Sequence, residues 1–124
     1  LLYKVDVEYQ EEIAHFFSNG FENDQYRIYV ANIENKLASF IMCSNHIRPK
    51  YFTIKNKGRI DSIYVDSNYR NQNLASKLVE KALDFMKDAH YIELEFTAEN
   101  QLAKEFWLNK GFQILNHQCI LNIK

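Results

Sequence analysis

Arg70 and the polar residues after it could bind an anion, because they stand where a helix is predicted to begin. Asp66 to Asn68 read as a polar turn, and from Leu74 onward the apolar residues recur with helical spacing. The first turn of a helix has unpaired backbone N–H groups and the positive end of the helix dipole, so an anion can bind there. The guanidinium of Arg70 adds a full charge and a planar fork of donors that suits a phosphate. These residues therefore predict a phosphate-binding cradle.

The elements that must position this cradle are a strand before the turn and a helix after it. Residues 60–65 are a short β-branched run, which is typical of a strand. One face of the following helix is apolar: Leu74, Leu78, Ala82, Phe85 and Met86. The opposite face is charged: Lys77, Glu80, Lys81, Asp84, Lys87 and Asp88. The connection is therefore strand, turn and helix.

Two motifs resemble the signature of the GNAT family of N-acetyltransferases. Its acetyl-coenzyme A motif is Arg or Gln, two residues, Gly, one residue, then Gly or Ala, and here Arg70 to Ala75 match it except for Asn73 in place of the glycine. The second motif is Asn100, Ala103 and the aromatic pair of Phe106 and Trp107, followed by Gly-Phe at 111–112. Two motifs at family spacing and in family order make the resemblance strong, and it extends loosely over nearly all of the chain.

The resemblance implies acetyl-coenzyme A as the cosubstrate and assigns residues to it. The cradle would hold the pyrophosphate with Arg70, Asn71, Gln72, Asn73, Leu74, Ala75 and Ser76. The pantetheine arm would lie between two splayed parallel strands, along the backbone of Ile63, Tyr64 and Val65, whose side chains serve the core. The N–H of Ile63 would face the thioester oxygen. The second motif would add Asn100, Ala103, Phe106 and Trp107, with Trp107 serving mainly in packing.

Asn73 is the one mismatch in the cradle. Glycine there would let a backbone N–H approach the pyrophosphate with no Cβ between them. The NH₂ of asparagine can donate to a phosphate oxygen and partly replace that contact. We therefore expect binding that is weakened rather than abolished.

Acetyl transfer to an amine needs a group that removes the amine proton. Histone-modifying members of the family carry a glutamate four residues before the position of Ile63, and Arg59 stands there in this chain. Asp61 is the leading candidate, because strand alternation predicts it on the same face as Ile63. Glu95, on the next predicted strand, is the second. Both could instead be ordinary solvated carboxylates.

The proton donor for the departing thiolate is a separate question. Many relatives have tyrosine as the second aromatic of the pair, whereas here it is Trp107, whose indole N–H does not act as an acid. Tyr64 or Tyr91 could substitute. The pKa of the coenzyme A thiol allows the thiolate to leave without being protonated. Such an acid therefore helps but is not required.

The composition excludes several classes of protein. A net charge of −1, from 15 basic and 16 acidic residues, gives no nucleic-acid signature. No apolar run approaches the length of a membrane span, so a cytoplasmic protein is expected. Cys43 and Cys119 lack metal or redox spacing and are expected to be free core thiols. The four histidines are scattered singly, so we expect no metal site and place each histidine at the surface or its boundary.

Read in order, the chain predicts antiparallel strands, the central helix, a strand, a second helix and a closing hairpin. A first strand and a helix are expected before residue 19, then strands at 26–33 and 37–44 joined by a turn. An extended segment at 51–54 and a turn at 55–58 lead into the strand at 59–65. Further strands are expected at 91–97, 112–116 and 118–123, with a helix capped by Asn100 between them.

The expected fold is α/β (α+β), a GNAT-like mixed and mostly antiparallel sheet with helices on both faces, in one domain spanning residues 1–124. The expected function is transfer of an acetyl group from acetyl-coenzyme A to a primary amine. The alternative is a degenerate domain that binds acyl-coenzyme A as a sensor, and a plain structural domain is the third reading. The acceptor would be a small-molecule or peptide amine, with no nucleic-acid or membrane partner. The aromatic residues Tyr26, Tyr29, Tyr51 and Phe52 could line an acceptor groove or a homodimer contact.

Overall fold

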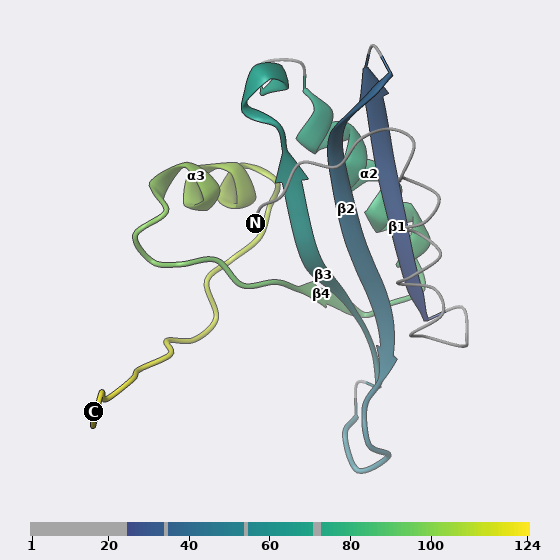
Figure 1. Ribbon diagram of the computed structural model, residues 1–124. Helices are drawn as coiled ribbons and strands as arrows, with labels where there is room; N and C mark the ends of the chain where they lie inside the picture. The colour runs from purple at the N-terminus through teal and green to yellow at the C-terminus, as the bar shows by residue number, and fades with distance from the viewer. Residues whose placement is uncertain (1–24, 34, 54, 71–72) are drawn as a thin grey trace. The chain divides into compact units, whose positions relative to one another are not determined.

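The computed structural model describes residues 25–33, 35–53, 55–70 and 73–124 (Figure 1). Its strands form one sheet in the order β1-β2-β3-β4, in which β1, β2 and β3 are antiparallel neighbours and β4 runs parallel to β3. The strands are β1 (Tyr26–Ile33), β2 (Lys36–Ile47), β3 (Asn56–Val65) and β4 (Tyr91–Glu93). The helices are the 3₁₀ turn η2 (Ser67–Tyr69), α2 (Leu74–Phe85) and α3 (Gln101–Asn109). The mixed, mostly antiparallel sheet is confirmed; the strand and helix expected before residue 19 lie outside the described residues.

The chain divides into two compact units, Leu1–Leu94 and Glu95–Lys124, and each is described by itself. The sheet and α2 belong to the first unit, and α3 belongs to the second. The single domain over residues 1–124 stays a prediction. Across the described residues, no helix combines the length and apolar character that crossing a bilayer requires.

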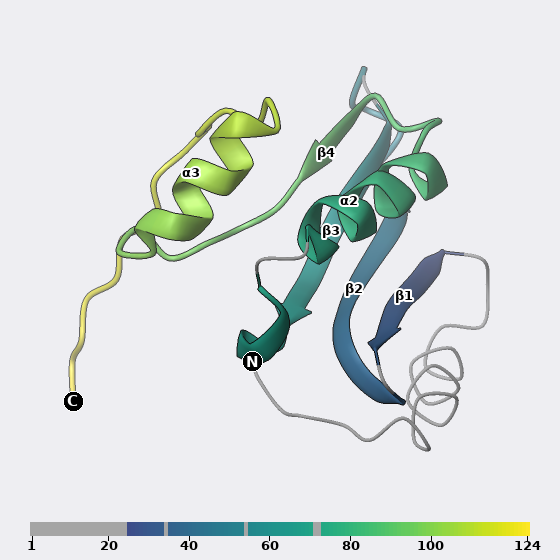
Figure 2. The same cartoon turned by 90° about the horizontal axis from the view of Figure 1, so that it is seen from above.

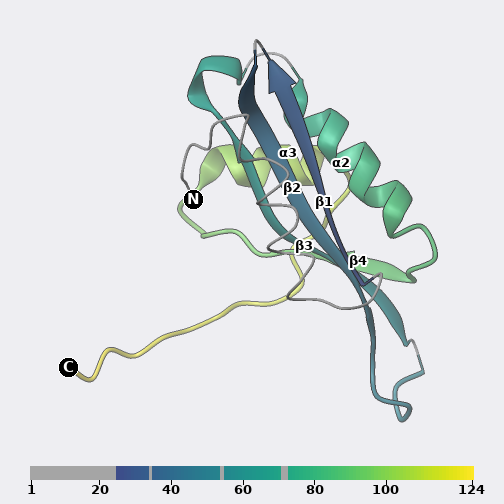
Figure 3. The ribbon, with the colours of Figure 1, turned by 45° about the vertical axis from the view of Figure 1, so that its right-hand side comes forward.

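The core of the first unit lies between the sheet and α2. Figures 2 and 3 show α2 on one side of the sheet, along β1, β2 and β3, and the helix makes contacts with all three strands. Of the predicted apolar face, Leu74, Leu78, Ala82 and Met86 are buried and Phe85 is half-buried, whereas the six predicted charged positions are exposed. Val79, which was not assigned to that face, is buried as well. The 3.6-residue period therefore identified the buried face of this helix correctly.

β2 is the central strand and contributes much of the core. Every residue from Leu37 to Ile41 is buried, so over this stretch side chains on both faces of the strand are shielded from solvent. Cys43 is buried as well, and desolvation, followed by the charge of Asp61, raises the pKa of its thiol to about 12 against the lowering effect of Arg27. The expectation of a core thiol is confirmed for Cys43 and is wrong for Cys119, which is free but exposed.

The turn between β2 and β3 differs from the expected one. The predicted turn at 55–58 is wrong, because residues 56–58 already pair with β2, and the described residues of the predicted extended segment, 51–53, form the turn instead. The connection is closed by hydrogen bonds from the Arg48 N–H to the Lys55 carbonyl at 2.7 Å and from the Phe52 N–H to the Pro49 carbonyl at 3.0 Å. Gly58 had suggested a turn, but its small size serves packing: a Cβ there would lie 2.6 Å from Sδ of Met86.

Three strands predicted near the C-terminus are short or absent. Strand β4 ends at Glu93 rather than at residue 97, and residues 112–123 are not strands. Apolar alternation suggested these strands, but a strand also needs a neighbour for its backbone hydrogen bonds, and the described residues supply none there. Large apolar side chains are consequently exposed in this segment: Ile114, Leu115, Ile120, Leu121 and Ile123.

The contact between Gly58 and Met86 gives a test of the packing at the end of α2. We expect Gly58→Ala to lower the free energy of unfolding by about 1–3 kcal/mol, because the added methyl group overpacks the junction. Urea denaturation measures this loss. If the clash with Met86 is the cause, the double variant with Met86→Ala will lose less than the sum of the two single losses. Additive losses would show that the cost arises elsewhere.

Candidate functional site

The connection from β3 to α2 is fixed at Asp66. This residue is 6% exposed, and its N–H donates to the carbonyl of Ala38 in β2 at 2.8 Å. Its carboxylate accepts from the N–H of Asn68 at 2.9 Å and thereby caps the short η2 turn. A capping carboxylate directly after the strand therefore sets where the chain turns toward α2. The sequence analysis took Asp66 only as part of a polar turn; its position directly before Ser-Asn was the available signal.

The mouth of α2 has the features that an anion site needs. Arg70 is exposed and directly follows η2. Asn73 is the N-cap residue but its side chain makes no capping hydrogen bond, and no acidic residue lies in the first turn of the helix. Within the described residues, neither a cap from Asn73 nor an acidic residue of the first turn compensates the positive end of the helix dipole. Asn71 and Gln72 lie outside the described residues.

Asn73 adopts a left-handed backbone conformation, with φ 57° and ψ 24°. Glycine takes this conformation without steric cost, and asparagine takes it more readily than most other residues. This explains in backbone terms why asparagine can stand where the family motif has glycine. From this position the Asn73 carbonyl accepts the hydrogen bond of the Lys77 N–H at 3.2 Å.

The remaining predicted cradle residues begin α2 itself. Leu74 is buried against the core, whereas Ala75 and Ser76 are half-buried. A buried first residue anchors the helix, so that its first turn is held next to the end of β3. These residues can offer backbone N–H groups to an anion, because the first turn of a helix does not use them internally.

Strand β3 continues well past its pairing with β4. The parallel pairs run from Lys57–Tyr91 to Arg59–Glu93, and beyond Arg59 the only strand that pairs with β3 in the described residues is β2. Among the described residues, the stretch 60–65 therefore has a strand neighbour, β2, on one side only. The opposite edge can accept an extended ligand as an added strand.

The direction of the backbone groups along that edge follows from Asp66. Its N–H points to β2, and N–H groups alternate between the two sides of a strand. The N–H groups of Ile63 and Val65 therefore point away from β2, toward the opposite edge. The N–H of Tyr64 points toward β2, so Tyr64 does not offer its N–H there.

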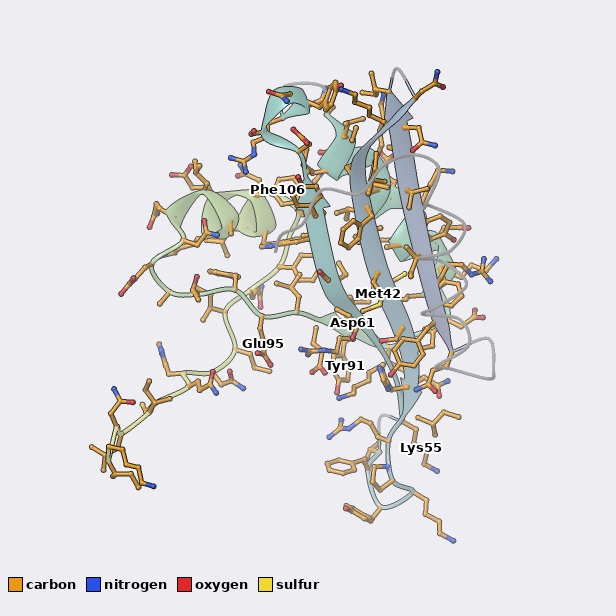
Figure 4. The ribbon with its side chains drawn as sticks, viewed as in Figure 1. Met42, Lys55, Asp61, Tyr91, Glu95 and Phe106 are labelled. Carbon is orange, nitrogen blue, oxygen red and sulfur yellow. The ribbon has the colours of Figure 1, made fainter. Side chains whose placement is uncertain are left out.

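A β-bulge in the pairing of β2 with β3 decides where the side chain of Asp61 lies. Ile60 pairs with Cys43 and Ser62 pairs with Met42, so Asp61 is the extra residue between the two pairs. A bulge breaks the simple alternation of side chains and bends the strand. Figure 4 shows Asp61 and Met42 near the middle of the sheet.

The side chain of Asp61 consequently lies on the face away from α2. Its carboxylate accepts a hydrogen bond from the Ser44 hydroxyl at 2.7 Å, while the next residue, Asn45, donates from its side chain to a carbonyl of α2 at 3.3 Å. Ile63 pairs with Ile41, which by alternation lies on the α2 side. The expectation that Asp61 and Ile63 share a face is therefore wrong, because strict alternation does not survive the bulge.

Arg59 links Asp61 to a network of charged side chains. The side chain of Asp61 is 17% exposed, and Nε of Arg59 lies 3.5 Å from its Oδ1. Arg59 also reaches Glu93 at 3.4 Å, and Glu93 pairs with Lys57 at 2.9 Å. Burial acts to raise the pKa of Glu93, but hydrogen bonds and charge from Lys57 and Arg59 outweigh it, so this pKa is lowered. Asp61 thus belongs to a fixed network of charges rather than to a solvated surface.

Tyr64 lies on the same face as Asp61. Its ring packs against Phe40 with a centroid distance of 5.8 Å, and its hydroxyl makes a long contact of 3.5 Å with Asp66. Tyr91, the other candidate acid, has its ring 5.8 Å from the guanidinium of Arg48. Both phenols are therefore partly engaged by neighbouring groups.

The second predicted motif lies in the second unit. The side chain of Asn100 accepts from the Ala103 N–H at 3.0 Å, so the predicted cap of α3 is confirmed. Trp107 is 5% exposed and makes edge-on contacts with Phe106 at 4.8 Å and Phe112 at 5.3 Å. This aromatic cluster supports the packing role for Trp107.

Glu95 also belongs to the second unit. It is exposed and lies outside any strand, so the strand position that made it the second candidate base is not present. Its role as a base stays a prediction.

Two polar residues near Asp61 were missed by the sequence analysis. Ser44 and His46 lie two residues apart on β2, and both hydrogen-bond within the sheet. The predicted strand ended at Ser44, whereas β2 extends to Ile47, so no signal in the sequence placed His46 on the same strand. Within the described part of the chain, no cluster of side chains could hold a metal ion.

Comparisons with known proteins agree on one family. The family model described as "Acetyltransferase (GNAT) family" matches residues 2–112. An uncharacterized N-acetyltransferase of Archaeoglobus fulgidus is 24% identical over 109 residues, which are 84% of this chain and 71% of that protein.

Two solved structures illustrate the similarity of fold. The aminoglycoside N-acetyltransferase AAC(6')-Iy, in complex with CoA, superposes with a TM-score of 0.72 at 13% identity, over 98% of each chain. Glucosamine-6-phosphate N-acetyltransferase of Arabidopsis thaliana gives a TM-score of 0.71 at 23% identity, over 92% of this chain and 78% of that one.

The conformation of Asn73 makes a testable prediction about stability. Asn73→Ala should lower the free energy of unfolding by about 1 kcal/mol, because alanine is strained in the left-handed region, whereas Asn73→Gly should not lower it. Glu80, exposed in the interior of α2, is the matched control: there glycine should be worse than alanine by about 1 kcal/mol. Urea denaturation of the four variants measures both differences. The same order of alanine and glycine at both positions would contradict the assigned conformation.

Proposed function

The chain belongs to the acetyltransferase (GNAT) family, whose model matches residues 2–112, and we propose how its own residues carry out acetyl transfer. It is an N-acetyltransferase that depends on acetyl-coenzyme A. The observation that carries the proposal is the arrangement along one connection: an edge of β3 that pairs with no strand of the described residues, then η2, then the mouth of α2, where the side chain of Asn73 makes no capping bond.

The mouth of α2 fits the pyrophosphate of coenzyme A. The side chain of Asn73 makes no capping bond and no carboxylate lies in the first turn, so the positive end of the helix is available for an anion. Arg70 adds a full positive charge from an exposed position beside it. Asn71 and Gln72, from the same motif, are proposed to contribute through their backbone. Leu74, Ala75 and Ser76 supply the first turn.

The edge of β3 that faces away from β2 fits the pantetheine arm, which carries amide groups that can bond like those of a strand. The N–H groups of Ile63 and Val65 point to that edge. We assign the N–H of Ile63 to the thioester oxygen, where one donor aimed at developing negative charge is worth about 3 kcal/mol in comparable acyl-transfer sites. Because this N–H lies in the plane of the sheet, the assignment holds although the side chains of Ile63 and Asp61 lie on opposite faces. Asn100, Ala103, Phe106 and Trp107 remain assigned to the cofactor by their motif.

Asp61 is the proposed general base. An amine is protonated at neutral pH and must lose a proton before it can attack. The carboxylate of Asp61 is partly exposed yet held by Ser44 and Arg59, so it has a defined direction from which to accept that proton. Glu95 is the alternative base, but the fixed network around Asp61 favours Asp61.

Tyr64 is the proposed donor to the departing thiolate, because its phenol lies on the same face as Asp61. Trp107 cannot release a proton, and its place in an aromatic cluster indicates packing. The acid has a minor part, since a thiolate is a good leaving group.

The acceptor is an amine, and we propose a small molecule rather than a peptide. The two solved relatives carry names that specify small amines, an aminoglycoside and glucosamine 6-phosphate. The rival function as a non-catalytic acyl-coenzyme A sensor drew on Asn73 and Trp107. The left-handed backbone of Asn73 accounts for that residue without any loss of function, so the rival has less support.

Substitution of the base tests the proposed mechanism. Asp61→Asn should lower kcat by a factor of about 10²–10⁴, with little change in affinity for coenzyme A, because the amide cannot accept the amine proton. Thiol release from acetyl-coenzyme A, measured with a panel of small amines, gives kcat. Asp84→Asn, on the exposed face of α2, is the control and should match the wild type. An unchanged kcat would remove Asp61 from the role and make Glu95→Gln the next variant, whereas no thiol release by the wild type with any amine would contradict the function.

A further inference from the structure

A basic stretch of chain comes directly before Asp61. Residues 37–60 contain no acidic residue, whereas they contain five basic ones: Arg48, Lys50, Lys55, Lys57 and Arg59. The chain as a whole has 15 basic and 16 acidic residues, so its net charge conceals this local excess. A local excess of one sign beside a reaction site favours ligands of the opposite charge. Which acceptors are favoured therefore depends on the cations that share the face of Asp61.

Lys57 and Arg59 lie on the same face of the sheet as Asp61. Arg59 pairs with Ser44, whose hydroxyl donates to the carboxylate of Asp61 at 2.7 Å, and Lys57 stands two residues before Arg59 in β3. Gly58, which lies between these two cations, packs against the end of α2 on the opposite face. Side chains alternate along a strand, so Lys57 and Arg59 both point away from α2, as Asp61 does.

A carboxylate from β4 and a third cation lie at the same end of this face. Tyr91 pairs with Lys57 and Glu93 pairs with Arg59, and residues paired across strands share a face. The guanidinium of Arg48 lies 5.8 Å from the centre of the Tyr91 ring, which holds it next to the partner of Lys57. The described residues of the first unit therefore supply three cations and two carboxylates here.

The ion pairs leave Lys57 with capacity for a further anion. Arg59 contacts Asp61 at 3.5 Å and Glu93 at 3.4 Å, whereas Glu93 is the only carboxylate of the described residues within ion-pair distance of Lys57, at 2.9 Å. Burial acts to raise the pKa of Glu93, but Lys57 and Arg59 together outweigh it and lower this pKa. The ammonium of Lys57 has three N–H donors and its side chain is 27% exposed, so it can bind an anion without leaving Glu93.

The order of the charges along this face suits a ligand with an amine at one end and an acid at the other. Asp61, the proposed base, attracts the protonated amine. Lys57 stands four residues away in β3, at most about 13 Å along an extended strand, with Arg48 beside it. A zwitterionic ligand meets an opposite charge at each end. A ligand with two amines and no acid would bring its second ammonium against Lys57, where like charges repel.

We propose that the acceptor is a small amine that carries an anionic group, a phosphate or a carboxylate, and that Lys57 binds this group with Arg48 beside it. The inference rests on the proposed function and names the class of its acceptor. In the reaction the amine nitrogen bonds to the acetyl carbon, the proton of the amine passes to Asp61, and coenzyme A leaves as the thiolate. The anionic group takes no part in bond making, and its contact with Lys57 holds the amine against Asp61.

A matched set of amines tests this preference for charge. Each compound has a primary amine at one end of a chain of three to six carbons, and a hydroxyl, a phosphate, a carboxylate or a second amine at the other. Thiol release from acetyl-coenzyme A gives kcat/KM. At the best chain length we expect kcat/KM to be about tenfold higher for the phosphate or the carboxylate than for the alcohol, as one charge-assisted hydrogen bond would give, and lowest for the diamine.

Substitution of Lys57 tests the contact itself. In Lys57→Gln the ratio of kcat/KM for the acid to that for the alcohol should fall to about one, and Lys57→Glu should prefer the diamine, because the sign of the charge is reversed. Lys55→Gln is the matched control and should keep the wild-type ratio. It removes the same charge from an exposed position of the β2–β3 hairpin that Figure 4 shows apart from Asp61. Urea denaturation shows whether each variant is folded, and the ratio cancels any general loss of activity.

The outcomes separate this inference from the proposed function. A preference for either acid that disappears in Lys57→Gln supports the inference, and the better of the two acids identifies the group. Equal kcat/KM for acids and alcohol in the wild type, or a preference that survives Lys57→Gln, would overturn the anionic acceptor and leave acetyl transfer intact. An equal loss in Lys55→Gln would overturn the contact with Lys57 in favour of the overall charge of the hairpin. If the wild type releases no thiol with any amine, the proposed function fails and the inference fails with it.

Discussion

The extra residue in β3 is the constraint on which the site depends. Between Ile60 and Ser62 the strand has one residue more than β2 can pair, and this Asp61 lies two residues beyond Arg59, the last residue paired with β4. A bulge bends its strand and increases the local twist. At one level of the sheet β3 therefore bends and its pairing with β4 ends, while it stays paired with β2. Before that level it lies between β2 and β4. Beyond it, β2 is the one strand of the described residues that pairs with it, and the proposed acyl-transfer chemistry uses the opposite edge.

A second constraint operates where β3 passes into α2. Asp66 fixes the turn by bonding to β2 through its N–H and to Asn68 through its carboxylate. Asn73 then starts the helix from a left-handed conformation, and buried Leu74 holds the first turn against the core. The helix mouth and the strand edge are thus held by the same short connection. The proposed anion site therefore depends on this local arrangement and not on the net charge of the chain, which is −1.

Much of this arrangement could be predicted from the sequence because it is local. The face of α2 followed from apolar spacing, and the cap of α3 followed from Asn100. The predictions that were wrong depended on contacts between residues far apart in the sequence. Gly58 is typical of a turn, but here a glycine is needed because Met86 leaves no room for a Cβ. The face of Asp61 depended on a bulge, which is a property of two paired strands and leaves no mark in one of them. Residues 112–123 were expected to form two strands, but no strand of the described residues pairs with them.

The central claim is that the mouth of α2 holds coenzyme A through charge, and calorimetry of coenzyme A binding tests it most directly. The account predicts that Arg70→Glu weakens binding at least tenfold, about 1.4 kcal/mol, without loss of the fold. Lys87→Glu, which makes the same change of charge just past the C-terminal end of α2, should bind like the wild type. Equal affinity of Arg70→Glu and wild type, or an equal loss in both variants, would contradict the account.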